Sequence, residues 1–238
     1  MARLARLSVP GCPHHVVQAG CGASVFRSDD DCLFYIDCLR KGAREFGVLV
    51  AAYLLLPGEV HLVALPGDRD SLSRFMQSVS RRYVRWFNRR HGLEGTLWEG
   101  RFRSSPVAPE WLAQIALYIE RLPVERRFVS SPEQYVWSSF AHHAGLRTDP
   151  FLPSPAELSA ACCGAAGFTA VYGELLGEET PEGFGRMVEQ MTRRGRPIGP
   201  RDFIDRIPAP EERKRALRPR GRPRKSATLG SGHDTSDL

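Results

Sequence analysis

The chain has 238 residues, 42% of them hydrophobic and 25% charged, which suits a globular protein with one core and a smaller annex. No apolar run approaches the roughly 18 residues that a membrane span requires, and the first residues lack the apolar stretch of a secretion signal. We therefore expect neither a membrane nor a secreted protein, but a cytoplasmic one. The net charge of +6 is concentrated in residues 193–225, which hold 13 Lys or Arg against 4 Asp or Glu.

The first part of the chain predicts a strand, a helix and a hairpin. Residues 14–19, HHVVQA, have a strand pattern, and residues 29–46 predict a helix whose three leading aspartates suit its positive end. Residues 48–56 are a continuous apolar run typical of a buried strand. A Pro-Gly turn then returns the chain as a second strand over residues 59–65.

The next part predicts a long helix over residues 71–91 and, after an HGLEG break, a strand over residues 96–107. A further helix should begin at Pro109, which suits the first helical position, and end near Leu122 because Pro123 follows. The order βαββαβ predicts an α+β fold. We expect a ferredoxin-like antiparallel sheet with helices on one face, plus a small helical annex and a basic tail.

These patterns divide the chain into three expected parts. Residues 1–147 form the main domain, and residues 148–192 form the annex, where a Pro-, Ala- and Gly-rich stretch surrounds short helices. Residues 193–238 form a flexible basic tail. The six cysteines match neither a disulfide framework nor a zinc site, so we expect reduced thiols. They are Cys12, Cys21, Cys32, Cys38, Cys162 and Cys163.

The tail contains Gly-Arg-Pro twice, within residues 193–199 and within residues 218–225. The extended backbone of such a segment can lie in an A·T-rich minor groove with its arginines reaching the floor, so the pattern resembles an AT-hook. Solvated charge that only aids solubility, or a chance match in an Arg- and Pro-rich segment, is the alternative. The candidate DNA-binding residues of the tail are Arg196, Arg222, Arg224 and Lys225.

The main domain resembles a known family in several short segments. The order of its elements, together with HHVVQAG, GTLWEGRFRS, YIERLPVERRFV and VWSSFAHHAG, is similar to that of the REP-associated tyrosine transposases, a branch of the single-tyrosine HUH transposases. The GRPRK segment of the tail is similar as well. The resemblance implies a transposase-like protein that binds DNA hairpins or repeats and cleaves and rejoins single-stranded DNA.

The resemblance also implies a mechanism and a metal. In the family, two histidines separated by one apolar residue on a strand hold Mg²⁺ or Mn²⁺, and a tyrosine attacks the DNA to form a 5′-phosphotyrosine. Carried onto this chain, the second histidine is His61 and the nucleophile is Tyr118. The first histidine is replaced by Glu59, and a polar ligand four residues after the tyrosine is replaced by Leu122.

These replacements leave the chemistry open. Leucine cannot bind a cation, whereas a glutamate can bind Mg²⁺ or Mn²⁺, so Glu59 and His61 form either a weakened metal site or one that is lost. Without the resemblance, His61 would be read as a satisfied strand histidine and Tyr118 as a packing residue of an amphipathic helix. A domesticated DNA-binding protein that does no chemistry is therefore the alternative to an active enzyme.

Arginines outside the tail predict contacts with the DNA backbone. On the helix over residues 71–91 they recur on one face and can neutralise phosphates, although a solvated charged face is the alternative. Two more arginines share a side of the following strand. The full set is Arg82, Arg85, Arg89, Arg101 and Arg103. We expect DNA as the partner, as hairpin, single strand or A·T-rich duplex, and a monomer or homodimer.

Overall fold

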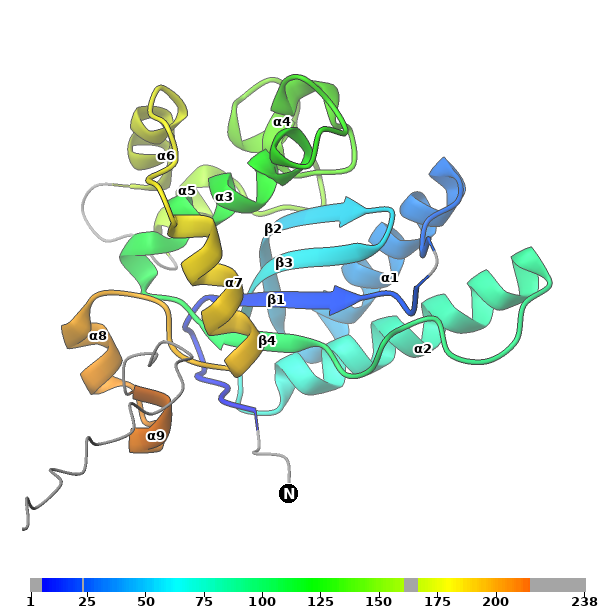
Figure 1. Ribbon diagram of the computed structural model, residues 1–238, viewed down its shortest axis with the longest axis horizontal. Helices are drawn as coiled ribbons and strands as arrows, with labels where there is room; N and C mark the ends of the chain where they lie inside the picture. The colour runs from blue at the N-terminus through cyan, green and yellow to red at the C-terminus, as the bar shows by residue number, and fades with distance from the viewer. Residues whose placement is uncertain (1–5, 23, 161–166, 215–238) are drawn as a thin grey trace, which may run out of the picture.

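A four-stranded antiparallel sheet organises the computed structural model, which describes residues 6–22, 24–160 and 167–214. The strands lie in the order β2-β3-β1-β4, as the ferredoxin-like expectation requires (Figure 1). They are β1 (His14–Ala19), β2 (Val48–Leu56), β3 (Glu59–Pro66) and β4 (Arg103–Pro106). The predicted α+β fold is confirmed, and β4 is one of the two edge strands.

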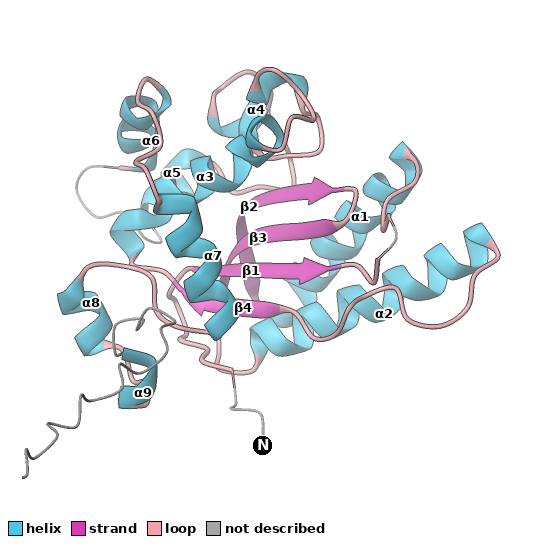
Figure 2. Cartoon of the chain, viewed as in Figure 1, coloured by secondary structure: helices cyan, strands magenta, loops and turns pink. Residues whose placement is uncertain are grey.

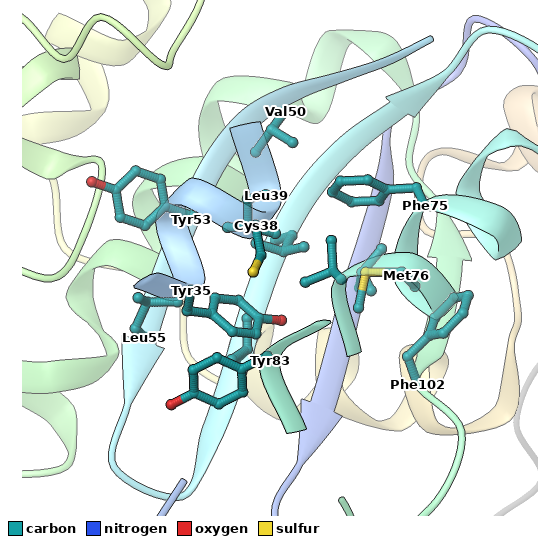
Figure 3. Close-up of a cluster of buried hydrophobic side chains, with 14 of the residues drawn as sticks. Tyr35, Cys38, Leu39, Val50, Tyr53, Leu55, Phe75, Met76, Tyr83 and Phe102 are labelled. Carbon is teal, nitrogen blue, oxygen red and sulfur yellow. The ribbon is translucent and has the colours of Figure 1, made fainter. Parts of the chain in front are cut away.

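Helices α1 (Asp29–Phe46) and α2 (Ser71–His91) cover one face of the sheet, with the bounds expected from the sequence. The helix α1 starts where the Asp31 carboxylate accepts the backbone N–H groups of Arg27 and Ser28, and it ends at Gly47, whose φ of 61° is left-handed. Alternate strand residues complete this core with side chains from both helices (Figure 3).

The second face is covered too, by α3 (Leu112–Glu125), α6 (Phe168–Leu176) and α7 (Phe184–Arg194). Figure 2 shows the strands between these helices and the α1–α2 layer. The expectation of helices on one face was therefore incomplete. Strand β2 is apolar on both sides, since Val50 and Tyr53 enter one core while Leu54 and Leu56 enter the other, and both surfaces need cover.

Two predicted boundaries were wrong. Helix α3 continues past Pro123 to Glu125, and the bond from Arg126 N–H to the Leu122 carbonyl closes its last turn. The strand expected over residues 96–107 is confined to β4. Leu97 and Trp98 are adjacent in sequence yet both enter the α1–α2 core, which an alternating strand does not allow.

Shorter helices complete the described chain. They are η1 (Pro109–Trp111), η2 (Pro132–Gln134), α4 (Phe140–His143), α5 (Pro155–Leu158), α8 (Arg201–Arg206) and α9 (Glu211–Lys214). Buried Glu120 of α3 accepts hydrogen bonds from Ser139 and Tyr172 and contacts His143 at 2.7 Å, which ties α3 to α4 and α6.

Four of the six cysteines lie in the described part of the chain. Cys12, Cys21, Cys32 and Cys38 are free thiols, while Cys162 and Cys163 lie outside the described residues. Across the same part of the chain, every helix is too short or too polar to cross a membrane.

Candidate functional site

The candidate site lies on the sheet face that α3 and α7 cover. Glu59 and His61 are two residues apart in β3, so both side chains point to this face, as predicted. His61 pairs in register with Val17 of β1, which places His15 on the same face two residues away. The two imidazole rings are stacked with their centroids 5.4 Å apart.

A continuous chain of hydrogen bonds crosses the site. The His15 Nδ1 atom lies 2.8 Å from the Thr192 hydroxyl, His15 Nε2 lies 3.2 Å from His61 Nδ1, and His61 Nε2 lies 2.9 Å from Glu59 Oε1. The Glu59 carboxylate can only accept, so His61 Nε2–H donates to it, while the donors of the other two contacts depend on the tautomers of the two rings. Burial, together with the charge of His61, holds the pKa of His15 well below its ordinary value.

The series of hydrogen bonds ends at Glu59, which forms an ion pair with Arg126, the residue after α3. The Arg126 guanidinium also lies 3.9 Å from Glu189 of α7. Burial raises the pKa of Glu59, but hydrogen bonds and charge from His61 and Arg126 outweigh it and lower that pKa to about 2. Glu59 is therefore ionised at neutral pH, and Arg126 compensates its charge.

Tyr118 lies under the start of α7. Its side chain is 2% exposed, its ring meets His15 edge-on at 6.3 Å, and its hydroxyl lies 3.5 Å from the Gly185 carbonyl oxygen. Burial, with the negative charges of Glu189 and Glu125, raises the pKa of the phenol above its ordinary value. A Cβ at position 185 would lie 2.9 Å from the tyrosine ring, so only glycine lets the helix approach this closely.

One face of α7 closes the site at three points. Gly185, Glu189 and Thr192 follow the i, i+4, i+7 spacing of one helical face, and they contact Tyr118, Arg126 and His15 respectively. Figure 1 shows α7 lying across β1 and β4. These contacts hold α7 over Tyr118, which is 2% exposed.

The residues predicted to hold Mg²⁺ or Mn²⁺ are close together, but as arranged they do not fit a metal ion. Both ring nitrogens of His61 have partners, and Glu59 is paired with a cation. Leu122 is 2% exposed and brings no donor atom. Within the described part of the chain, no group of three or more His, Cys, Asp or Glu side chains is placed to hold a metal ion.

The predicted arginines divide between the two faces of the molecule. Arg82, Arg85 and Arg89 are exposed on α2, which covers the opposite face from Tyr118, and Arg82 pairs with Glu45. Arg103 pairs in register with Val17, on the face of His61. Arg101 and Arg103 line one pocket with Val17 and Thr192, beside the candidate site, and the α2 arginines do not line it.

The first Gly-Arg-Pro segment is part of the fold rather than an extended arm. Gly195 ends α7 at a φ of 61°, and Ile198 forms a parallel bridge with Val107, with hydrogen bonds to Pro106 and Ala108. Arg196 lies between them. The second copy, with Arg222, Arg224 and Lys225, lies outside the described residues.

Sequence reasoning missed four members of the site. Two of them could have been found from the sequence. His15 lies two residues from Val17 in β1, so their side chains share a face of the strand, and Arg126 stands eight residues after Tyr118, on the same side of a helix. Thr192 and Glu189 could not have been found, because they belong to a helix far along the chain.

Comparisons with known proteins found no matching family model and no matching curated protein. Among solved structures, a REP-associated tyrosine transposase bound to a REP hairpin is similar, with a TM-score of 0.47 and 20% identity over 65% of this chain and 92% of that chain. A putative transposase from Deinococcus radiodurans is also similar, with a TM-score of 0.36 and 21% identity over 50% of this chain and 97% of that chain.

Proposed function

We propose that this protein is a transposase-like DNA-processing protein that binds DNA hairpins and cleaves and rejoins single-stranded DNA through Tyr118. The observation that carries the proposal is the convergence of Tyr118, His15, His61, Glu59 and Arg126 on one buried face. These residues come from β1, β3 and the α3 segment. A phenol, a hydrogen-bonded imidazole pair and a guanidinium are groups suited to phosphoryl transfer.

In the proposed reaction the Tyr118 oxygen attacks the phosphorus of a phosphodiester. The bond from the tyrosine oxygen to the 5′ phosphate forms, and the bond from phosphorus to the 3′ oxygen breaks. The phenol loses its proton, and the leaving 3′ oxygen takes up a proton to become a hydroxyl. Arg126, the cation of the site, would then neutralise phosphate charge. Rejoining is the reverse reaction.

The described arrangement is a closed state in this proposal. Tyr118 is covered by Phe184 and Gly185, and its raised pKa makes the buried phenol a weak nucleophile. Displacement of α7 by the DNA would expose the hydroxyl and release Glu189 from Arg126. Cleavage should therefore require a strand that engages α7.

The second candidate is a DNA-binding protein that performs no chemistry. A specific observation favours it: Arg126 engages Glu59, the carboxylate expected to hold a metal, and Leu122 adds no ligand. In this reading the site is a structural network that anchors α7 to the sheet.

One experiment separates the candidates. The full chain is incubated with a labelled hairpin that carries a single-stranded flank, with Mg²⁺, Mn²⁺ or EDTA, and denaturing gels are examined for a protein–DNA adduct. An adduct that Tyr118→Phe abolishes supports the enzyme. Hairpin binding in a native gel without any adduct supports the silent protein, and the absence of binding contradicts both.

A further inference from the structure

A basic groove runs along the edge strand β4, next to the candidate site. Its volume is about 370 Å³, and it is bounded by residues 99–104, by the end of α7, and by the N-terminal and C-terminal parts of the described chain. Six arginines line it: Arg6, Arg101, Arg103, Arg193, Arg194 and Arg213. Glu99 is the acidic residue among the lining side chains of the described chain.

Four of the six groove arginines have no carboxylate partner within the described part of the chain. Arg101, Arg103, Arg193 and Arg194 are exposed, and in the described residues none of the four forms an ion pair with a carboxylate. On α2, by contrast, Arg82 pairs with Glu45. Guanidinium groups gathered without an ion-pair partner favour the binding of an anion.

The dimensions of the groove indicate the kind of anion. At about 30 Å³ for each water molecule, 370 Å³ holds roughly a dozen waters, which is more room than one phosphate group needs. The arginines come from two separate walls, one formed by residues 99–104 and one by α7. A single polynucleotide strand, with successive phosphates, fits this arrangement.

The groove also leads to the site. Val17, which lines it, pairs in register with His61, and Thr192, on its α7 wall, contacts His15. Phe102 lies 8% exposed beneath Arg6, so this aromatic ring is not presented for stacking with bases. Recognition would therefore act through phosphates and tolerate any base sequence.

We propose that the β4 groove is the track for a single DNA strand, held by Arg101 and Arg103 on one wall and Arg193 and Arg194 on the other. This inference rests on the proposed function, since it takes DNA as the ligand. Because Arg193 and Arg194 follow Thr192 on α7, a strand in the groove engages the helix that covers Tyr118. Binding of a strand in the groove is thereby linked to the position of the helix that covers Tyr118.

The test is fluorescence anisotropy of a labelled oligo-dT strand with the full chain over a range of salt concentrations. Two groove variants are compared, Arg101→Gln with Arg103→Gln and Arg193→Gln with Arg194→Gln. The matched control is Arg82→Gln with Arg85→Gln on α2, and thermal melting verifies that each variant folds. Each groove variant should lose affinity on the order of tenfold and lower the slope of log K against log salt by about 1.4, because single strands contribute about 0.7 per phosphate.

The outcomes separate the groove from the proposed function. Weakened binding in both groove variants, with the control unchanged, supports the groove. Weakened binding in the control alone overturns the groove but leaves DNA binding intact. Unchanged binding in both groove variants overturns the proposal. A wild-type chain that binds no strand overturns the groove and the proposed function together.

Discussion

Replacing Ile198 by alanine should show whether the first Gly-Arg-Pro segment belongs to the fold. The side chain is 1% exposed and packs in the core on the α3 side of the sheet. The substitution removes three buried carbon atoms, worth about 2.4 kcal/mol at roughly 0.8 kcal/mol each, before any cavity is counted. With the cavity, we expect the free energy of unfolding to fall by about 3 kcal/mol.

The measurement is the melting temperature of the full chain, followed by circular dichroism. At about 2–4 °C for each kcal/mol in a chain of this size, Ile198→Ala should lower Tm by about 6–12 °C. Ile204→Ala is the matched control, because Ile204 in α8 is only partly buried. It should lower Tm by about a third as much.

Two results would contradict the packing of Ile198 in the fold. If the segment were an arm that works only in DNA binding, Ile198→Ala would leave Tm unchanged and weaken DNA binding instead. A shift no larger than that of Ile204→Ala would also contradict the proposed packing. The expected shift would mean that a deletion meant to test the tail must start after Lys214, where the described fold ends.

Three further predictions concern the site and the fold. Arg126→Gln should raise the affinity for Mn²⁺, measured by titration calorimetry, on the order of tenfold, since Glu59 loses its cation; equal affinities would contradict this. Asp31→Asn should cost about 1–2 kcal/mol at pH 7. Burial raises the pKa of Asp31, but hydrogen bonds, first from His91, outweigh it and lower that pKa, so its stabilisation is present above about pH 3.9 and lost below. Melting curves should therefore show the difference shrinking in acid, and a constant difference would refute the pairing. Tyr118→Phe should change stability by less than about 1 kcal/mol in urea unfolding, because the hydroxyl makes one long 3.5 Å contact; a larger loss would show that this hydroxyl anchors α7.

Much of the site could be placed from the sequence because strands alternate. Glu59 and His61 had to share a face of β3, and they do. What each side chain would contact was not predictable. The Arg126 guanidinium reaches Glu59 because α3 runs past Pro123, and the local rule that proline ends a helix pointed the other way.

For the surface arginines, too, the sequence predicted the exposure of the side chains but not what they lie next to. The helical pattern placed Arg82 and Arg85 on an exposed face of α2, and they are exposed. Their side of the molecule depends on how α2 packs against the sheet, which no local pattern encodes. Arg193 and Arg194 were read as part of a free tail, yet they end a helix whose buried face lies on β1 and β4.

The sequence by itself determined the order of the elements as far as α3, the bounds of β1, α1, β2 and α2, and the shared face of Glu59 and His61. Each of these follows from the spacing of apolar residues, turns and caps within a few positions of the chain. Only the tertiary structure decided that α7 covers Tyr118, that Arg126 pairs with Glu59 and that two stretches of arginine meet across one groove. These contacts join segments as much as 177 residues apart, as between His15 and Thr192, and depend on the packing of the whole fold.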